Sequence, residues 1–210
     1  EISLEFCRRL GVQARVLPMS DDPVRTEVLT SDGAVTFHEY FSELACEPAV
    51  KGFHYAGAAE ARLSDEVIGA LHAPDLEAVV ICPANPYHAI RPILEVEGMK
   101  ELLKKRGAPV IAVTPIVGGK ALKGSAGKMM RELGREPSAL GVAGEYLRFI
   151  DGFVIDREDA ALAEAVRSLG LKVHVAQTVM RTDEMRLALA RSVLDFARSV
   201  REAKALELAS

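Results

Sequence analysis

Short apolar runs alternate with amphipathic segments along most of the chain. Apolar runs predict strands at residues 77–82, 109–113, 152–155 and 171–176, and the run at 77–82 is unbroken, as in strands covered on both faces. Helical spacing of apolar positions predicts helices at residues 2–10, 67–71, 98–106, 125–133, 138–150 and 157–169, and from Thr182 onward. Strands that alternate with helices of this length predict a parallel α/β sheet with right-handed crossovers.

The first part of the chain has a different pattern. We expect a strand at residues 14–17, directly after the first helix. The β-branched segments 26–30 and 34–37 are separated by a Ser-Asp-Gly turn, which predicts a β-hairpin. This hairpin is either an insertion in the α/β fold or part of a small subdomain at residues 26–76.

The composition is that of an ordinary globular protein. The 210 residues are 49% hydrophobic and 27% charged, enough to bury a substantial core, and we expect a single α/β domain over residues 1–210. A net charge of −4 leaves no excess positive charge for a nucleic-acid backbone. No apolar run approaches the roughly 20 residues that span a bilayer, and three dispersed cysteines fit reduced thiols. We therefore expect a cytoplasmic protein without nucleic-acid or membrane partners.

Candidate chemistry follows two of the expected strands, because open parallel sheets bind ligands at the carboxyl ends of their strands. The loop after residues 77–82 is stiffened by prolines and carries Asn85, Pro86 and His88. The loop after residues 109–113 is rich in glycine and lysine: Thr114, Gly118, Gly119, Lys120, Lys123 and Gly124, with Ser125 at the start of the next helix. Free backbone, positive charge and a helix N-terminus together suit a diphosphate.

Ordinary structural interpretations stand beside these. Gly119 and Gly124 have the glycine spacing of a Walker loop, but Ser125 stands where its Lys should be, so a glycine-rich turn with solvated lysines is equally open. Asn85, before a proline, is also a common turn residue that bonds its own backbone.

A pair of carboxylates, Asp21 and Asp22, precedes the hairpin. Asp before Pro is typical of a turn that ends a strand. Set beside the lysines of the glycine-rich loop, the same pair suits a metal-bridged diphosphate, in which the metal neutralises charge while phosphorus is attacked.

Three segments, in this order, resemble the 2-phospho-L-lactate transferase family of coenzyme F420 biosynthesis: residues 17–24, 83–94 and 114–130. The resemblance implies a Rossmann-like parallel sheet with flanking helices and, usually, a homodimer. It also implies transfer of a phospholactyl or phosphoenolpyruvyl group from a guanosine-diphosphate-linked lactate or enolpyruvate to the deazaflavin Fo, with release of GMP and with Mg²⁺ present.

The resemblance also implies roles for individual residues. Those matched to the donor-nucleotide loops are Asn85, Pro86, Thr114, Gly118, Gly119, Lys123 and Gly124. Asp21 and Asp22 match an acidic loop that faces the active site, which makes them candidates for catalysis and for holding magnesium. Two positions depart from the family pattern: Ala84 replaces a Ser, and Ser125 stands where the family usually has Pro.

The resemblance covers only the carboxyl-terminal two thirds of the family. Family members begin with a strand and a Gly-Gly-Thr-Gly loop, which this sequence lacks, so we expect low or no activity from these residues alone. A nucleotide-sugar-binding regulatory protein of the same superfamily and an inactive fragment are the alternatives, although residues 17–24 favour the transferases. The choice between lactyl and enolpyruvyl donors, any general base and the oligomeric state stay open.

Overall fold

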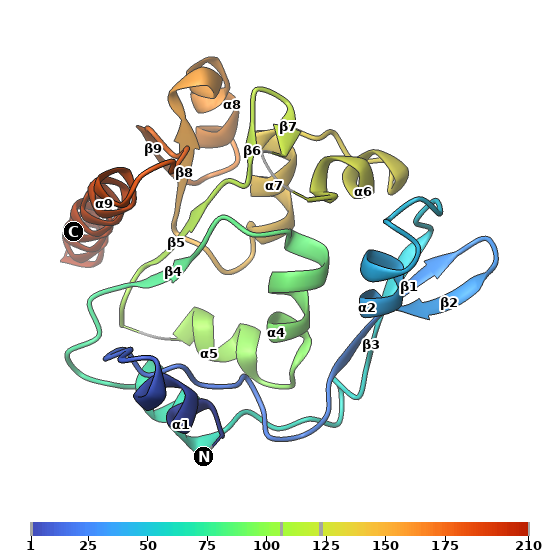
Figure 1. Ribbon diagram of the computed structural model, residues 1–210. Helices are drawn as coiled ribbons and strands as arrows, with labels where there is room; N and C mark the ends of the chain where they lie inside the picture. Colours follow the sequence, from blue (N-terminus) through green and yellow to red (C-terminus); the bar gives the residue numbers. More distant parts are fainter. Residues whose placement is uncertain (1, 106, 122–123, 210) are drawn as a thin grey trace.

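A four-stranded parallel sheet forms the centre of the computed structural model, which describes residues 2–105, 107–121 and 124–209 (Figure 1). In spatial order its strands are β4 (Val79–Ile81), β5 (Val110–Val113), β8 (Gly152–Asp156) and β9 (Lys172–Ala176). Every neighbouring pair is parallel. The predicted α/β class, with a parallel sheet and flanking helices, is confirmed.

Helices cover both faces of this sheet. The helical segments that the structure describes are α1 (Ile2–Arg9), α2 (Phe37–Ser42), α3 (Asp65–Leu71), η1 (Pro86–Ile90), α4 (Arg91–Glu95), α5 (Met99–Lys105), α6 (Ala126–Glu132), α7 (Ala139–Tyr146), η2 (Arg157–Leu162), α8 (Ala163–Arg167) and α9 (Asp183–Ala209). Across the described ranges, no helix combines the length and the apolar character needed to cross a membrane.

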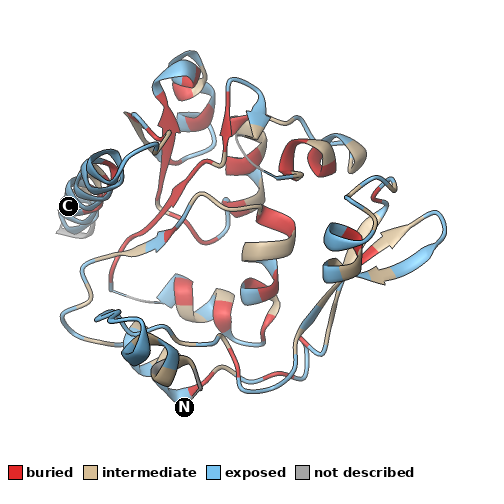
Figure 2. Ribbon diagram, in the orientation of Figure 1, coloured by how far each residue is buried: buried red, intermediate tan, exposed pale blue. Residues whose placement is uncertain are grey.

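The two central strands explain where the core lies. All residues of β5 and β8 are buried, and Figure 2 shows this burial concentrated in the sheet and the helix faces against it. Successive strand residues point to opposite faces: Ile111 packs toward α9, with Val193, whereas Val110 belongs to the core on the other face, with Val142 of α7. Because both faces of β5 and β8 are covered, these strands need apolar residues at successive positions rather than at every second position.

A second, smaller sheet lies beside the core. Its strands are β1 (Arg25–Thr30), β2 (Gly33–Thr36) and β3 (Gly52–Ala56), antiparallel in the order β2-β1-β3. The predicted hairpin is confirmed as β1 and β2. We call these strands together with α2 the small sheet unit. It lies within the range 26–76 suggested as a subdomain except for Arg25, while the domain boundaries themselves stay a prediction.

Three expectations about single elements were wrong. No strand forms at residues 14–17, because this segment is largely exposed and pairs with no described strand. The helix expected over 138–150 ends at Tyr146, and the one expected over 157–169 begins as a 3₁₀ segment before α8. In the latter, the Asp156 side chain accepts a hydrogen bond from the Glu158 backbone N–H, which holds the first turn.

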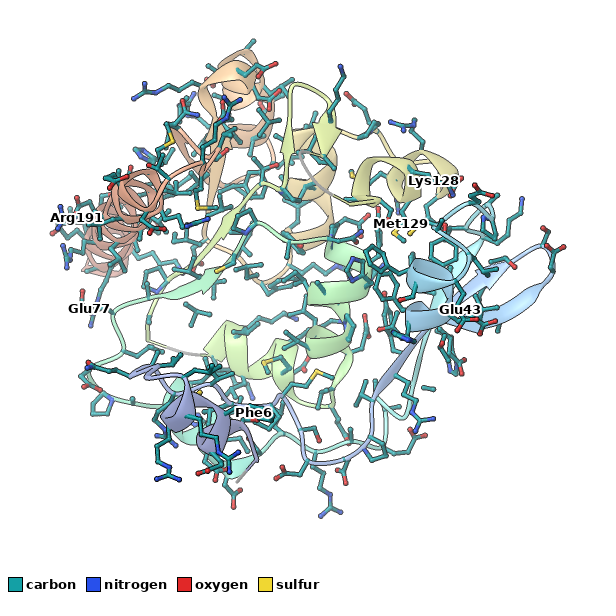
Figure 3. The ribbon with its side chains drawn as sticks, in the orientation of Figure 1. Phe6, Glu43, Glu77, Lys128, Met129 and Arg191 are labelled. Atoms are coloured by element: carbon teal, nitrogen blue, oxygen red, sulfur yellow. The ribbon has the colours of Figure 1, made fainter. Side chains whose placement is uncertain are left out.

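A buried tyrosine joins the small sheet unit to α6. The Tyr40 hydroxyl lies 2.8 Å from the carbonyl oxygen of Pro48 and 3.0 Å from that of Cys46. Lys128 of α6, which lies beside the unit in Figure 3, donates to the same hydroxyl at 3.1 Å and pairs with Glu132 at 2.7 Å. The small sheet unit is thus fastened to the core through polar contacts as well as apolar packing.

Tyr40→Phe is expected to lower the free energy of unfolding by about 1 kcal/mol, because it leaves carbonyl groups and the Lys128 ammonium without the hydroxyl. Tyr146→Phe is the matched control, since the buried Tyr146 hydroxyl has no hydrogen-bond partner within the described ranges. That control should be neutral or slightly stabilising. Urea denaturation measures both variants, and equal effects would contradict the role assigned to Tyr40.

Candidate functional site

A cavity of about 760 Å³ lies at the carboxyl ends of the parallel strands. Its walls come from segments that follow β4, β5 and β9, from the start of α6, and from Phe41 of the small sheet unit. The contributing segments are residues 83–88, 114–117, 124–126 and 178–186. The strand-end rule used on the sequence therefore leads to one of the cavities of the described structure.

Three of the expected donor-binding residues, Asn85, Thr114 and Gly124, line this cavity together. The Asn85 side-chain oxygen caps η1, accepting from the backbone N–H of Tyr87 at 2.9 Å and of His88 at 3.4 Å. Its amide nitrogen lies 3.2 Å from the Met129 sulfur. Asn85 is therefore both the turn residue of the ordinary interpretation and a wall of the cavity. Pro86 is buried in the first turn of η1 and does not line the cavity.

The loop after β5 is shaped by its own hydrogen bonds. The Thr114 hydroxyl, buried, donates to the Ile116 carbonyl at 3.0 Å and accepts from the Ile116 N–H at 3.1 Å. Gly124 has a φ of +75°, in the left-handed region that suits glycine. The Ser125 hydroxyl also lines the cavity, 3.5 Å from the Met129 sulfur. A weak sulfur acceptor leaves this hydroxyl able to reorient toward a ligand.

Gly118 and Gly119 do not line the cavity. Gly118 and Gly119 form the two-residue turn between β6 (Ile116–Val117) and β7 (Lys120–Ala121), with φ values of 56° and 72°. A tight hairpin of this kind requires positive φ at both central residues. The Gly118 N–H donates to the Asp159 carboxylate at 3.1 Å. These glycines lie outside the cavity wall, and the turn accounts for them without a ligand. Lys123 lies outside the described residues.

The acidic pair is also separate from the cavity. An Asp22 carboxylate oxygen accepts from the Arg62 backbone N–H at 2.9 Å, and the Asp22 N–H donates to the Ser20 hydroxyl at 3.1 Å. Asp21 is exposed, and neither carboxylate lines the cavity. The structure does not bring the two carboxylates to Asn85 and Thr114. Their expected roles in catalysis and metal binding stay predictions.

Two arginines after β9 were missed by the sequence reasoning. Arg181 and Arg186 line the cavity, and Arg186 also forms an ion pair with Asp183 in the first turn of α9. They follow the carboxyl end of a parallel strand, so the rule that singled out the other two loops could have found them. Phe41 also lines the cavity, but nothing in the local sequence indicates this.

The segment that carries Arg181 is anchored by a buried carboxylate. Asp156, at the end of β8, accepts from the Thr178 backbone N–H at 2.7 Å and from the Thr178 hydroxyl at 2.8 Å. Burial alone would raise the pKa of Asp156, but the hydrogen bonds from Glu158, Thr178 and Val179 outweigh it and lower that pKa. The carboxylate thus stays charged and fixes the direction in which the chain leaves β9.

The side chains of the described residues do not form a complete metal site. Among the residues that the structure describes, no group of three or more His, Cys, Asp or Glu side chains is placed to hold a metal ion. Magnesium in phosphoryl-transfer sites commonly combines one or two carboxylates with substrate phosphates. The described residues alone do not fit a resident magnesium ion.

Solved structures resemble this fold. Two crystal structures of protein BH3568 from Bacillus halodurans, one of them described as a member of the UPF0052 family, match with TM-scores of 0.61 and 0.58 at 18% and 17% identity. The first match covers 91% of this chain and 65% of that one, and the second covers 89% and 64%. At such low identity, these matches concern the fold alone.

Sequence relatives are closer. The 2-phospho-L-lactate transferases of Methanosarcina barkeri and Methanosarcina mazei are each 40% identical, over 91% and 88% of this chain. A phosphoenolpyruvate transferase of Streptomyces griseus is 34% identical over 93% of it. The chain spans about 60% of the length of these curated relatives. The sequence model of the family described as "2-phospho-L-lactate transferase CofD" matches residues 2–193. The chain belongs to this family.

Proposed function

We propose that this protein is a transferase of coenzyme F420 biosynthesis. It moves a phospholactyl or phosphoenolpyruvyl group from a guanosine-diphosphate-linked donor to the deazaflavin Fo and releases GMP. The observation that carries the proposal is the cavity at the strand ends, where Asn85, Thr114 and Gly124 meet Arg181. Membership in the family supports the transferase class.

The proposed reaction needs alignment and charge stabilisation more than covalent catalysis. The terminal ribityl hydroxyl oxygen of Fo forms a bond to the phosphorus that carries the lactyl or enolpyruvyl group. The bond from that phosphorus to the bridging oxygen breaks, the electron pair leaves with GMP, and the proton of the hydroxyl is released to solvent. Arg181 and Arg186 could hold the diphosphate, because a guanidinium presents paired N–H groups to phosphate oxygens. Positive charge aimed at the developing negative charge lowers the barrier.

The names of the relatives differ in the three-carbon acid that the donor would carry. The Methanosarcina proteins are named for 2-phospho-L-lactate, and the Streptomyces protein is named for phosphoenolpyruvate. The two groups differ by one unsaturation, and no described residue distinguishes them. We therefore propose the donor only as a class, a guanosine diphosphate esterified to a three-carbon acid.

Magnesium belongs to the proposal as an ion that would neutralise the diphosphate when bound. Because the described residues do not form a complete metal site, the phosphate oxygens of the donor would be its principal ligands. The proposal also includes a homodimer in the cytoplasm, with small molecules rather than nucleic acid or membranes as partners.

GDP is expected to raise the melting temperature of the protein, because a ligand that binds only the folded state stabilises it. Arg181→Ala should weaken GDP binding about tenfold, the loss of one charge-assisted contact to phosphate. Arg191→Ala is the matched control, because Arg191 is an exposed arginine on α9 that does not line the cavity (Figure 3). Thermal shift and calorimetric titration measure both variants.

Three results would count against the proposal. A larger thermal shift with a UDP-sugar than with GDP or GMP would favour the regulatory alternative. No shift with any nucleotide would favour the inactive fragment. Equal GDP affinities of Arg181→Ala and Arg191→Ala would remove the arginine from the donor site.

A further inference from the structure

Three aromatic side chains form a stack at one wall of the cavity. The rings of Phe37 and His88 lie 3.9 Å apart with an interplanar angle of 15°, and those of Phe37 and Phe41 lie 5.9 Å apart at 24°. Phe37 and Phe41 lie on α2 of the small sheet unit, whereas His88 lies on η1 of the core. We call Phe37, Phe41 and His88 the aromatic ledge.

The ledge meets the cavity through two of its members. His88 and Phe41 line the cavity, and Phe37 stacks on His88 and on Phe41 without lining it. Phe41 is 56% exposed, so part of its ring is open to solvent. An exposed aromatic face beside a hollow offers apolar surface that a flat ligand would cover.

The wall near the ledge is apolar and its imidazole is uncharged. Pro83, Ala84 and Pro115 line the same cavity and add apolar surface to that of the ledge. Burial lowers the pKa of His88, which keeps the imidazole neutral at physiological pH. A neutral, flat heterocycle fixed by Phe37 is a suitable surface for offset stacking.

Positive charge enters the cavity from a different segment. Arg181 and Arg186 follow β9, whereas the ledge is built from α2 and η1. The cavity therefore combines a cationic part with an aromatic part within about 760 Å³. A phosphate group and a fused heteroaromatic ring, carried by one molecule or by two, would satisfy both parts.

We infer that the aromatic ledge binds the planar ring of a substrate by stacking, with Phe41 and His88 as residues that determine specificity for the ring. This inference rests on the proposed function, which supplies two molecules with such rings: the guanine of the donor and the deazaflavin of Fo. The shared chemistry is a flat, fused heteroaromatic system. Replacing a stacked aromatic side chain by alanine typically weakens ring binding by about tenfold to a hundredfold.

The test compares probes with and without a ring. GDP and Fo carry the two rings, and inorganic pyrophosphate carries none. Binding to the chain is followed by calorimetry and, for Fo, by quenching of the deazaflavin fluorescence, which reports ring stacking directly. The variants are Phe41→Ala, His88→Ala and His88→Phe, the last of which keeps an aromatic face.

Phe6→Ala is the matched control. Phe6 is 60% exposed, close to the 56% of Phe41, and lies on α1 at the other end of the molecule from α6 (Figure 3). Melting temperatures of all variants establish that each one is folded. The control should bind every probe as the unchanged protein does.

We expect Phe41→Ala and His88→Ala to weaken the binding of one ring-bearing probe at least tenfold. The affinity for pyrophosphate should not change in either variant. His88→Phe should bind the ring-bearing probe as the unchanged protein does. The probe that weakens identifies the ring. Unchanged affinity for both GDP and Fo in both alanine variants, or no binding of either probe to the unchanged protein, would overturn the inference. Pyrophosphate binding that depends on Arg181 would in that case leave the phosphate part of the proposed function standing. Binding of a ring-bearing probe without any binding of pyrophosphate would contradict the proposed donor site, but the inference about the aromatic ledge would still hold.

Discussion

Asp156→Asn is expected to lower the free energy of unfolding by about 3 kcal/mol, because it replaces a buried charged acceptor with an amide. One carboxylate oxygen accepts from both the Thr178 N–H and the Thr178 hydroxyl, at 2.7 and 2.8 Å. The other accepts from the Glu158 N–H at 3.0 Å. An amide keeps one of these acceptors and turns its NH₂ toward donors. Chemical denaturation at neutral pH measures the loss.

The same variant should alter the pH dependence of stability. Because hydrogen bonds lower the pKa of Asp156 below 3.8, its ordinary value, its contribution is present above that value and disappears as pH falls through the lowered one. The difference between the unchanged protein and Asp156→Asn should therefore shrink in strong acid. Asp195→Asn is the control, since that side chain is 73% exposed and paired only with Arg198 in the described structure. Equal losses in both variants would contradict the role of Asp156.

Gly141→Ala is expected to destabilise the protein by about 2 kcal/mol, whereas Gly144→Ala on the same helix should stabilise it by about 0.5 to 1 kcal/mol. A Cβ at Gly141 would lie 2.2 Å from the Glu136 backbone oxygen and 3.0 Å from the Met130 methyl group. A Cβ at Gly144 would meet nothing within 4 Å. Both variants gain the higher helix propensity of alanine. The difference between their free energies of unfolding therefore measures the effect of the contact between a Cβ at position 141 and the Glu136 carbonyl oxygen.

Urea denaturation of the two alanine variants, with equal m-values, is the measurement. Stabilisation by both changes would show that the loop before α7 can move away at little cost. Destabilisation by both would show that α7 requires glycine for its backbone rather than for contact with the Glu136 carbonyl.

The parallel sheet could be predicted because its two central strands are buried on both faces. The runs that became β5 and β8 have no polar position, and only a covered strand tolerates that composition. Residues 14–17 also look strand-like, but a strand needs a neighbouring strand to pair with, and the local sequence does not show whether one is present. The ends of helices depend in the same way on what packs against them.

The candidate site was predictable where it follows the sheet. Asn85 and Thr114 could be placed because the topology sends both loops to one edge. Gly118 and Gly119 look like a ligand loop because a tight hairpin and a phosphate loop require the same backbone freedom. Phe41 could not be found, since it reaches the cavity only through the packing of the small sheet unit on the core.

The position of Phe41 on the small sheet unit has an evolutionary consequence. Phe41 reaches the cavity from the small sheet unit, whereas the other residues that line it come from loops and helices of the core. If the aromatic ledge stacks on a substrate ring as inferred, a change at the exposed Phe41 would alter which ring the cavity accepts without replacing any residue of the parallel sheet. Substrate preference would then depend in part on a residue that lies outside the parallel sheet.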